Sequence, residues 1–552
     1  MRIFSSSRGA GGRQPAGIGG LTTAAAVLLL AFSVQARQDP TPRSQIGREV
    51  AIARHLEDDE EFRIPVTELI EHGRRLFIAS WTDQEGAGRP LMKGTGKELT
   101  DPSQPLVGAR AFNRISAPDA NSCAGCHNQP FGIIGGGGDF VTNVFVMAQR
   151  FDYVTFGADD APTTMVDEAR QAVRLDTVGN SRSTLGMFGA GYLEMLAREI
   201  TAELHAIRDG MKLGDSRPLV AKGISFGTLA RKADGMWDTS QVEGMGRLSL
   251  LAPTPLDRPS LIVRLWHQAS HVVSLREFTN TSFNHHHGIQ ATERFGRDTD
   301  PDGDGVTNEL TRADVTAATV FQATMAVPGR VIPDDPEVEA AVALGERTFE
   351  QIGCARCHVP ALPLTRAGWT YTEPNPYNPS GNLRVGDAPT LKVDLTDPYL
   401  PQPRLRPSAS SPDVIMVPAY TDFKLHDITD PDDAAAAEPV DMNQSLVSAR
   451  LRGGNRRFVT RRLWGAANEP PYFHHGKFTT LRQAVLAHHG EALGERRAFE
   501  RLPAPSQDAL IEFLKTLQVL PPGTVSLIVD QHGRPRTWPS TSAPRSSSLT
   551  MP

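Results

Sequence analysis

Two copies of a five-residue motif restrict the fold of this chain more than any other feature. They are Cys123-Ala-Gly-Cys126-His127 and Cys354-Ala-Arg-Cys357-His358, and they contain all four cysteines of the 552 residues. Cysteines three positions apart lie on one side of a helical turn, so both sulfurs can form thioethers with one haem. The next residue then offers an imidazole to the iron. The motifs predict two covalently bound haem c groups, with His127 and His358 as iron ligands.

Zinc sites and short disulfides also use pairs of cysteines with this spacing. A zinc ribbon, however, has its two pairs much closer in sequence than these two motifs. Neither alternative requires a histidine directly after each pair. Attachment of two haem groups is therefore the favoured interpretation.

The N-terminal segment has the pattern of an export signal. Residues 1–36 contain three arginines, no acidic residue, an apolar run from Leu21 to Val34 and small residues at Val34-Gln-Ala36. This pattern predicts a cleaved signal peptide, because the apolar run is shorter than the roughly 20 residues that span a bilayer. We therefore expect a soluble, periplasmic protein, and the net charge of −6 argues against a nucleic acid partner.

A similar helix is expected before each motif. Apolar residues have helical spacing over Ile64–Trp81 and Val338–Gln351, and each stretch contains Gly-x-x-x-Phe, as Gly73…Phe77 and Gly345…Phe349. The repetition predicts two cytochrome-c-like domains in tandem. The expected fold class is mainly α, with long loops and some small β insertions. Further elements are predicted as a strand at 141–148 and helices at 187–204, 312–325 and 506–519.

These patterns give four expected segments. The signal peptide spans 1–36, the N-terminal haem domain with its insertions spans 37–330, and the C-terminal cytochrome-c-like domain spans 331–525. The Ser/Pro-rich stretch 526–552 is expected to be a disordered tail.

An acidic loop at 298–309 follows the calcium pattern D-x-D-x-D-G-x5-E. The oxygen ligands would come from Asp298, Asp300, Asp302, Asp304 and Glu309. Reading from Asp300 instead leaves Thr311 at the closing position, which is poorer, and a solvated acidic turn is the other alternative. The spacing predicts Ca²⁺ as a further cofactor.

Three adjacent histidines, His285, His286 and His287, are typical either of a solvated loop or of a functional pocket. In the functional interpretation, one of them or Glu293 projects into the pocket of the first haem. Trp266 is either a core aromatic residue or lies between the two haem groups.

The chain resembles the bacterial di-haem cytochrome c peroxidases and MauG-like enzymes, and within them the putative di-haem oxidoreductase/peroxidase family, some of whose members are labelled thiol oxidoreductases. The resemblance covers roughly residues 60–520. It rests on Arg114–Asn128, Phe283–Gln290 with Glu293–Gly296, Gly353–Val359, Tyr420–Asp427, and Leu463-Trp464-Gly465 with Pro471-Tyr-Phe-His-His-Gly476 and the residues up to Glu491.

The resemblance implies unequal haem sites. The residue that corresponds to the second distal ligand is His488, with His489 as the alternative one position later. His474 and His475 would contact a helix start or the propionates, and His426 either lies near this haem or is a buried, hydrogen-bonded histidine.

The first haem lacks a nearby distal histidine, since the next one after the motif is His205. An open or weakly filled sixth position follows, with Glu293 as the distal acid and His287 as a second catalytic candidate. The resemblance also implies calcium near the haem groups.

The expected function is therefore that of a periplasmic di-haem peroxidase. Electrons from a small c-type cytochrome or a cupredoxin would enter at the second haem, and peroxide would be reduced at the first. Two alternatives stay open: an electron-transfer cytochrome, and a dioxygen-using enzyme similar to the di-haem rubber oxygenases. Whether the chain forms a homodimer also stays open.

Overall fold

The computed structural model describes residues 41–87, 121–145, 179–430 and 456–539. The segment 1–36, expected to be a signal peptide, lies outside these ranges. Within them, no helix combines the length and the apolar character needed to cross a membrane.

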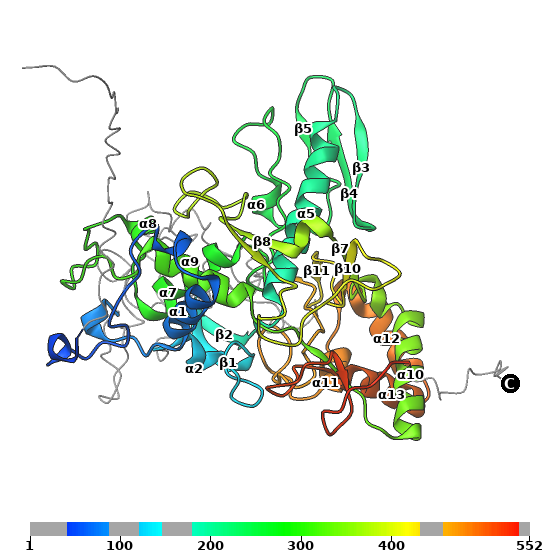
Figure 1. Cartoon of the computed structure of the whole chain (residues 1–552). Helices are drawn as coiled ribbons and strands as arrows, with labels where there is room; N and C mark the ends of the chain where they lie inside the picture. Colours follow the sequence, from blue (N-terminus) through cyan, green and yellow to red (C-terminus); the bar gives the residue numbers. More distant parts are fainter. Residues whose placement is uncertain (1–40, 88–120, 146–178, 431–455, 540–552) are drawn as a thin grey trace, which may run out of the picture.

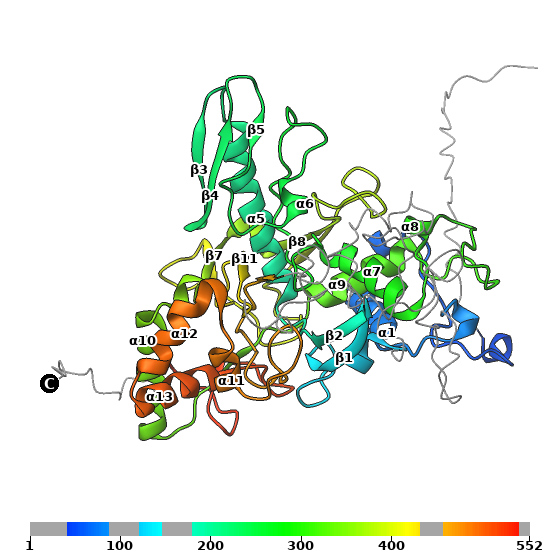
Figure 2. The ribbon, with the colours of Figure 1, turned by 180° about the vertical axis from the view of Figure 1, so that it is seen from behind.

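The helices gather at two ends of the molecule, with a central region between them (Figures 1 and 2). One end, which we call the first-motif end, contains α1 (Val66–Ile78), α2 (Cys123–Cys126), α7 (Leu275–His287), α8 (Thr292–Phe295) and α9 (Arg312–Ala323). The opposite, second-motif end contains α10 (Pro336–Gln351), α11 (Leu481–Leu486), α12 (Leu493–Arg501) and α13 (Ala504–Lys515). The central region includes α5 (Ala190–Asp209) and the short α6 (Arg247–Leu250).

Strands form six sheets of two or three strands each in the described part of the chain. The pairs are β1 (Gly138–Phe145) with β2 (Gly179–Thr184), β7 (Leu362–Thr365) with β10 (Val414–Val417), β8 (Thr370–Glu373) with β9 (Leu391–Asp394), and β11 (Leu425–Asp427) with β12 (Arg457–Val459). The three-stranded sheets are β3 (Ser216–Ala221), β4 (Ile224–Arg231) and β5 (Trp237–Asp238), and β13 (Leu517–Gln518), β6 (Gly329–Val331) and β14 (Ile528–Val529). The architecture is therefore mixed α/β, and the prediction of a mainly α chain agrees only roughly.

The expected helix before each motif is confirmed, and both helices pack in the same way. α1 crosses α9 at Gly73, where a Cβ atom would lie 2.0 Å from the carbonyl oxygen of Ala317. α10 crosses α13 at Gly345, where a Cβ atom would lie 2.0 Å from the carbonyl oxygen of Ala509. Only glycine allows main chains to approach so closely. The repeated glycine is therefore explained by a repeated helix crossing.

The phenylalanine of each repeat points from this crossing toward a motif histidine. The Phe77 ring packs against Phe321 of α9 and lies 5.9 Å from the His127 ring, centre to centre. The Phe349 ring packs against Phe513 of α13 and lies 6.3 Å from the His358 ring. The two ends thus place their motifs against equivalent helix pairs.

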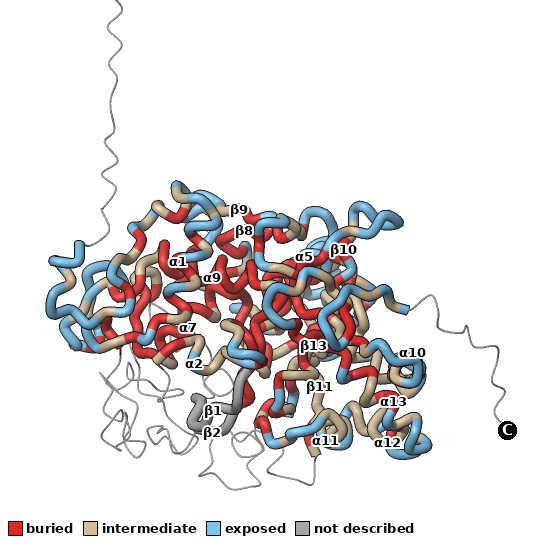
Figure 3. Tube along the Cα trace, turned by 60° about the horizontal axis from the view of Figure 1, so that its bottom comes forward, coloured by how far each residue is buried: buried red, intermediate tan, exposed pale blue. Residues whose placement is uncertain are grey.

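Buried residues run through the whole molecule, and α5 lies deep in the central region (Figure 3). The side chains of Tyr192, Leu196, Ile200 and Leu204 on this helix are fully buried in the largest apolar cluster. Separate clusters surround α1 with α9 and α10 with α13. The core therefore consists of a large central cluster and a smaller cluster at each end.

The prediction that 526–552 is a disordered tail is wrong for residues 526–539. Ile528 and Val529 pair in parallel with Arg330 and Val331 of β6. The Trp538 indole donates to Glu346 at 3.0 Å. Main-chain pairing and side-chain contacts hold this stretch, although its composition is typical of a tail. Residues 540–552 lie outside the described ranges.

Candidate haem-binding cavity

A cavity of about 650 Å³ lies between the two ends, and residues of both motifs line it. Its lining also contains ten of the 16 histidines of the chain, so histidine is strongly concentrated there. The ten are His127, His267, His271, His285, His286, His287, His358, His426, His474 and His488. His267 and His271 belong to no motif that the sequence reveals, and they join the others only through the fold.

The His127 imidazole is held at one ring nitrogen by the main chain. Its Nδ1 donates to the Gly136 carbonyl at 3.1 Å. The chain can fold back at this point because residue 136 is glycine, where a Cβ atom would lie 1.7 Å from the Gln129 carbonyl oxygen. A metal-binding histidine commonly donates its second ring N–H in this way, which fixes the ring orientation. Nε2 is therefore left as the nitrogen for a metal.

The second motif has two histidines with the same arrangement. Nδ1 of His358 donates to the Tyr420 carbonyl at 3.1 Å, and Nδ1 of His488 donates to the Ala484 carbonyl at 2.8 Å. The two ring centres are 6.4 Å apart. An imidazole nitrogen binds a metal at about 2.0–2.1 Å, so two rings on opposite sides of one iron have centres roughly 6 Å apart. The pair fits one iron between two Nε2 atoms.

The alternative ligand, His489, turns away from this pair. Its Nε2 contacts Arg496 at 2.7 Å and its Nδ1 lies 3.4 Å from the Asp430 carboxylate. It does not line the cavity. Of the two neighbouring candidates, His488 is thus the one that faces His358. His474 also lines the cavity and stacks on Phe458, with ring centres 3.8 Å apart, whereas His475 does not line it.

Burial keeps the imidazoles of His127, His358 and His488 neutral. It lowers the pKa of His127 and that of His358 to about 4, and it also lowers the pKa of His488. A metal binds the neutral imidazole, so these shifts favour ligation at neutral pH.

The four cysteines are free thiols, so the disulfide alternative is not what the structure contains. Burial raises the pKa of Cys123 and of Cys354 to about 12, so both thiols are protonated. In the described part of the chain, the two cysteine pairs do not converge on one metal-binding cluster, as a zinc site made from both pairs requires.

The three adjacent histidines form the last turn of α7 and are not part of a solvated loop. His285 and His287 are buried, and all three residues line the cavity. Nε2 of His287 lies 3.6 Å from the sulfur of Cys123. Ser274 caps the start of α7 and Gly288, with a positive φ, ends it, so the helix delivers its histidines beside the first motif.

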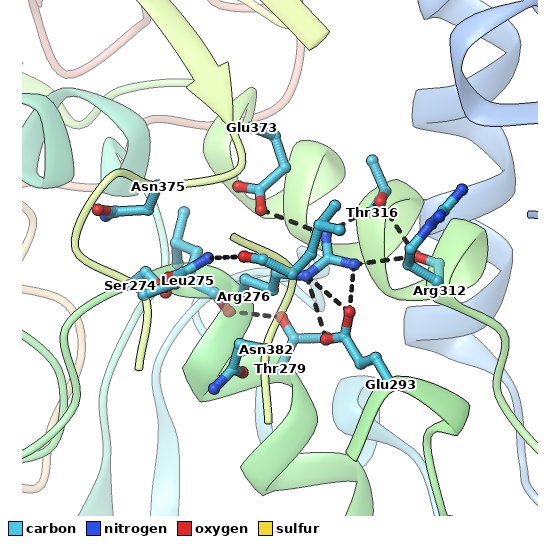
Figure 4. A network of polar contacts seen from close by, with 12 residues as sticks. Ser274, Leu275, Arg276, Thr279, Glu293, Arg312, Thr316, Glu373, Asn375 and Asn382 are labelled. Carbon is cyan, nitrogen blue, oxygen red and sulfur yellow. Dashed lines mark hydrogen bonds and ion pairs between the residues drawn. The ribbon is translucent and has the colours of Figure 1, made fainter. Parts of the chain in front are cut away.

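Glu293 lies outside the cavity lining, which differs from the expected position of a distal acid. Its carboxylate accepts from the fully buried Arg276, whose Nη2 is 2.6 Å away, and from Asn280. Figure 4 shows Arg276 between Glu293 and Glu373, whose carboxylate is 3.2 Å from Nη1. The physical reason is charge compensation, because a buried guanidinium requires carboxylate partners. Glu293 therefore anchors α7 from the side away from the cavity.

His426 is bound by two carboxylates. Its Nε2 lies 2.8 Å from Asp422 and its Nδ1 lies 2.7 Å from Glu491. Burial opposes the charged form, but Asp422 and then Cys357 raise the pKa of His426 to about 10. Ligand atoms of Cys357, Asp422 and His426 also lie within 4.8 Å of one another. His426 is thus a charged neighbour of the second motif.

The acidic loop brings together only part of its predicted ligands. Carboxylate oxygens of Asp300, Asp302 and Asp304 lie within 4.8 Å of one another, as in the reading that begins at Asp300. Burial and then the neighbouring carboxylates, first Asp304, raise the pKa of Asp302 to about 7. Such crowding of carboxylates suits a hard cation.

The first and last residues of the predicted calcium pattern, Asp298 and Glu309, are not part of the cluster of three aspartates. Asp298 lies outside this cluster of three, because its carboxylate accepts the Asn308 side-chain amide at 2.7 Å and closes the loop. Mainly burial, with smaller effects from the three carboxylates, raises the pKa of Glu309 to about 10. Glu309 accepts from the main-chain N–H of Gln290 at 2.7 Å, three residues after the end of α7.

Comparisons with known proteins add little to this geometry. No protein-family model matches the chain, and no curated protein matches it. Among solved structures, one of hydrazine synthase from Kuenenia stuttgartiensis, pressurised with 20 bar of xenon, is similar to this chain. The match covers 54% of this chain and 78% of the hydrazine synthase chain. The identity is 14% and the TM-score is 0.25. We base no inference on a similarity of this size.

Proposed function

We propose that this chain is a di-haem c-type oxidoreductase of the peroxidase type. Cys123, Cys126 and His127 would hold the first haem. Cys354, Cys357, His358 and His488 would hold the second. Support comes from a cavity that contains both motifs and from ring nitrogens that are oriented by main-chain carbonyls. These features fit haem attachment, which uses two cysteines and one or two imidazoles.

The observation that carries the proposal is the inequality of the two sites. His358 faces His488 with ring centres 6.4 Å apart. The His127 ring contacts the Phe77 ring, and in the described residues it makes no ring contact with a histidine like the one between His358 and His488. A haem with two imidazole ligands transfers electrons, whereas a haem with an open position can reduce peroxide. We therefore place the chemistry at the His127 site.

The protein supplies proton-transfer groups at the first-motif end through α7. His285, His286 and His287 line the cavity there, and His287 approaches Cys123. A positioned imidazole can take a proton from bound peroxide and return it to the departing oxygen. Glu293 is engaged by Arg276 and acts in this proposal by holding α7 in place.

The electronic and paramagnetic resonance spectra of the purified ferric protein test the proposal. We expect one low-spin and one high-spin haem at neutral pH, together with peroxide-dependent oxidation of a reduced c-type cytochrome or cupredoxin. Two low-spin haem groups and no turnover would instead identify an electron-transfer cytochrome. Oxygen uptake with polyisoprene, in the absence of peroxide, would identify an oxygenase.

We also propose that the acidic loop binds Ca²⁺ through Asp300, Asp302 and Asp304, with Glu309 at its buried side. The three aspartates already converge, and a hard divalent cation prefers such oxygen ligands. Export to the periplasm remains part of the proposal, because haem c is attached outside the cytoplasm in bacteria.

A further inference from the structure

One segment of the chain runs along the cavity from the second motif to the first. Near the second motif, the Thr460 carbonyl accepts from the Thr421 hydroxyl at 2.8 Å, and the Thr421 N–H donates to the Val359 carbonyl at 3.1 Å. Val359 directly follows His358. This part of the segment is therefore tied to the second site.

Two residues later the same segment reaches the first motif. Arg462 donates to the Gly186 carbonyl. Met187, which follows Gly186, donates its N–H to the Gly135 carbonyl at 2.6 Å. The Gly135 N–H in turn donates to the His127 carbonyl at 2.9 Å. The adjacent residues Arg461 and Arg462, which both line the cavity, thus lie at the boundary between the two sites.

Arg461 and Arg462 carry two positive charges, whereas their carboxylate neighbour Glu469 carries one negative charge. Glu469 lies 3.9 Å from Arg461, but its other oxygen already accepts from the Gly137 N–H at 2.7 Å. In the described part of the chain Arg462 has no ion pair. Burial lowers the pKa of Arg461 and lowers that of Arg462 to about 10, which reflects the cost of these charges. A positive charge that is partly withdrawn from water is stabilised when an anion binds beside it.

We propose that Arg461 and Arg462 bind haem propionate carboxylates at the boundary between the two sites. The inference rests on the proposed function, because it requires haem in the cavity. Each haem carries two carboxylates, and the planar guanidinium binds a carboxylate through two parallel hydrogen bonds. A cation at this position also disfavours the ferric iron, which has one more positive charge than ferrous iron. The arginine pair therefore raises the reduction potential of the haem that it contacts.

A redox titration of the haem-loaded protein, followed by its absorption spectrum, tests the proposal. We expect Arg461→Gln and Arg462→Gln to lower the midpoint potential of at least one haem, and the double variant to lower it further. Arg461→Lys and Arg462→Lys keep the charge and should retain most of the potential. Arg482→Gln is the control, because Arg482 lies outside the cavity lining and pairs with Asp508, whose carboxylate is 2.5 Å away. It should leave the potentials nearly unchanged.

Three outcomes would overturn the proposal. The first is an unchanged pair of potentials in the double variant with normal haem content. The second is an equal shift in the Arg482→Gln control. The third is a wild-type potential that depends on added inorganic phosphate and loses this dependence in the double variant, because the arginines would then bind an anion from solution. Absence of covalent haem in the wild-type protein would instead reject the proposed function, and a haem-content assay detects that separately.

Discussion

The imidazoles of His127, His358 and His488 share one arrangement, in which Nδ1 donates to a main-chain carbonyl and the residue lines the cavity. The motifs alone predict His127 and His358 as candidate ligands. The orientation of the His488 ring is set by the carbonyl of Ala484, four residues earlier. Residues with identical chemistry, such as His489, are excluded only by their direction.

Replacement of His488 by alanine should convert the low-spin haem to a high-spin haem, because the iron loses one strong-field nitrogen ligand. The ferric absorption spectrum measures this change. His489→Ala is the matched control and should leave the spectrum unchanged, since His489 contacts Arg496 and Asp430. Loss of the low-spin signal in the control, and not in His488→Ala, would contradict the assignment.

A second histidine cluster lies outside the cavity, around the buried carboxylate of Asp314. Its two oxygens lie 2.7 Å from His55 Nδ1 and 2.7 Å from His72 Nε2. Burial opposes ionisation, but His55 and His72 hold the pKa of Asp314 well below its usual range. Burial also opposes the charge of His55, but Asp314 raises the pKa of His55. The cluster ties the N-terminal loop to α1 and α9.

These shifts predict a pH window for stability. Since the pKa of Asp314 is depressed, its contribution is present above about pH 4 and is lost as the pH falls further. Since the pKa of His55 is raised, its contribution is complete below about pH 6.5 and is lost as the pH rises through its folded value. His55→Gln should therefore cost about 1.5–3 kcal/mol of unfolding free energy at pH 5.5 and less at pH 9.

Denaturant unfolding at the two pH values measures this difference. His532→Gln, at an exposed position, is the control and should cost little at either pH. An equal cost of His55→Gln at both pH values would contradict the role of the charged pair.

At the scale of elements, the two helix crossings are the features that the chain repeats. Gly73 and Gly345 allow α1 to touch α9 and α10 to touch α13, and each crossing places a phenylalanine beside a motif histidine. The distance between each motif histidine and the helix pair that supports it therefore depends on the absence of a side chain at the glycine.

Gly73→Ala and Gly345→Ala should each destabilise the protein by about 1–3 kcal/mol or more, because the new methyl group overlaps a main-chain carbonyl. Gly494→Ala in α12 is the matched control, since nothing lies within 4 Å of its Cβ position. It should be neutral or stabilise by about 0.5–1 kcal/mol, as alanine favours helix over glycine. Thermal unfolding measures all three variants. Equal melting temperatures for the three would contradict the close crossings.

On the scale of the whole molecule, the acidic loop and the cavity meet through the end of α7. Glu309 accepts from the Gln290 N–H, and Gln290 lies three residues after His287. A cation held by the loop would thus stabilise the region that carries the cavity histidines. The fold connects two predicted sites that are separate patterns in the sequence.

Calcium at 100 times its dissociation constant should stabilise the protein by about 2.7 kcal/mol, because only the folded state has the site. A rise in melting temperature after chelation and calcium add-back measures this effect. Asp302→Ala should abolish the rise. Asp298→Ala should retain most of it, because Asp298 is outside the cluster of three aspartates. The same loss in both variants would favour a ligand set that begins at Asp298.

Local patterns predicted the local structure well. The helices expected at 187–204, 312–325 and 506–519 appear as α5, α9 and α13, with ends shifted by a few residues. The helix that carries the three adjacent histidines was not predicted, since the alternatives were a solvated loop and a functional pocket. The order of residues 526–539 was not foreseen, since it depends on pairing with β6, almost 200 residues earlier.

The sequence by itself predicted the candidate metal ligands. His488 came from the resemblance, and the others came from the two motifs and the acidic loop. These depend on spacings of a few residues, which local geometry converts directly into proximity. The tertiary structure alone decided which way each side chain faces. It joined ten histidines in one cavity, set His488 against His358, turned Glu293 toward Arg276 and placed Arg461 and Arg462 at the boundary. Such choices follow from packing and charge compensation between segments far apart in the chain, and no local pattern contains them.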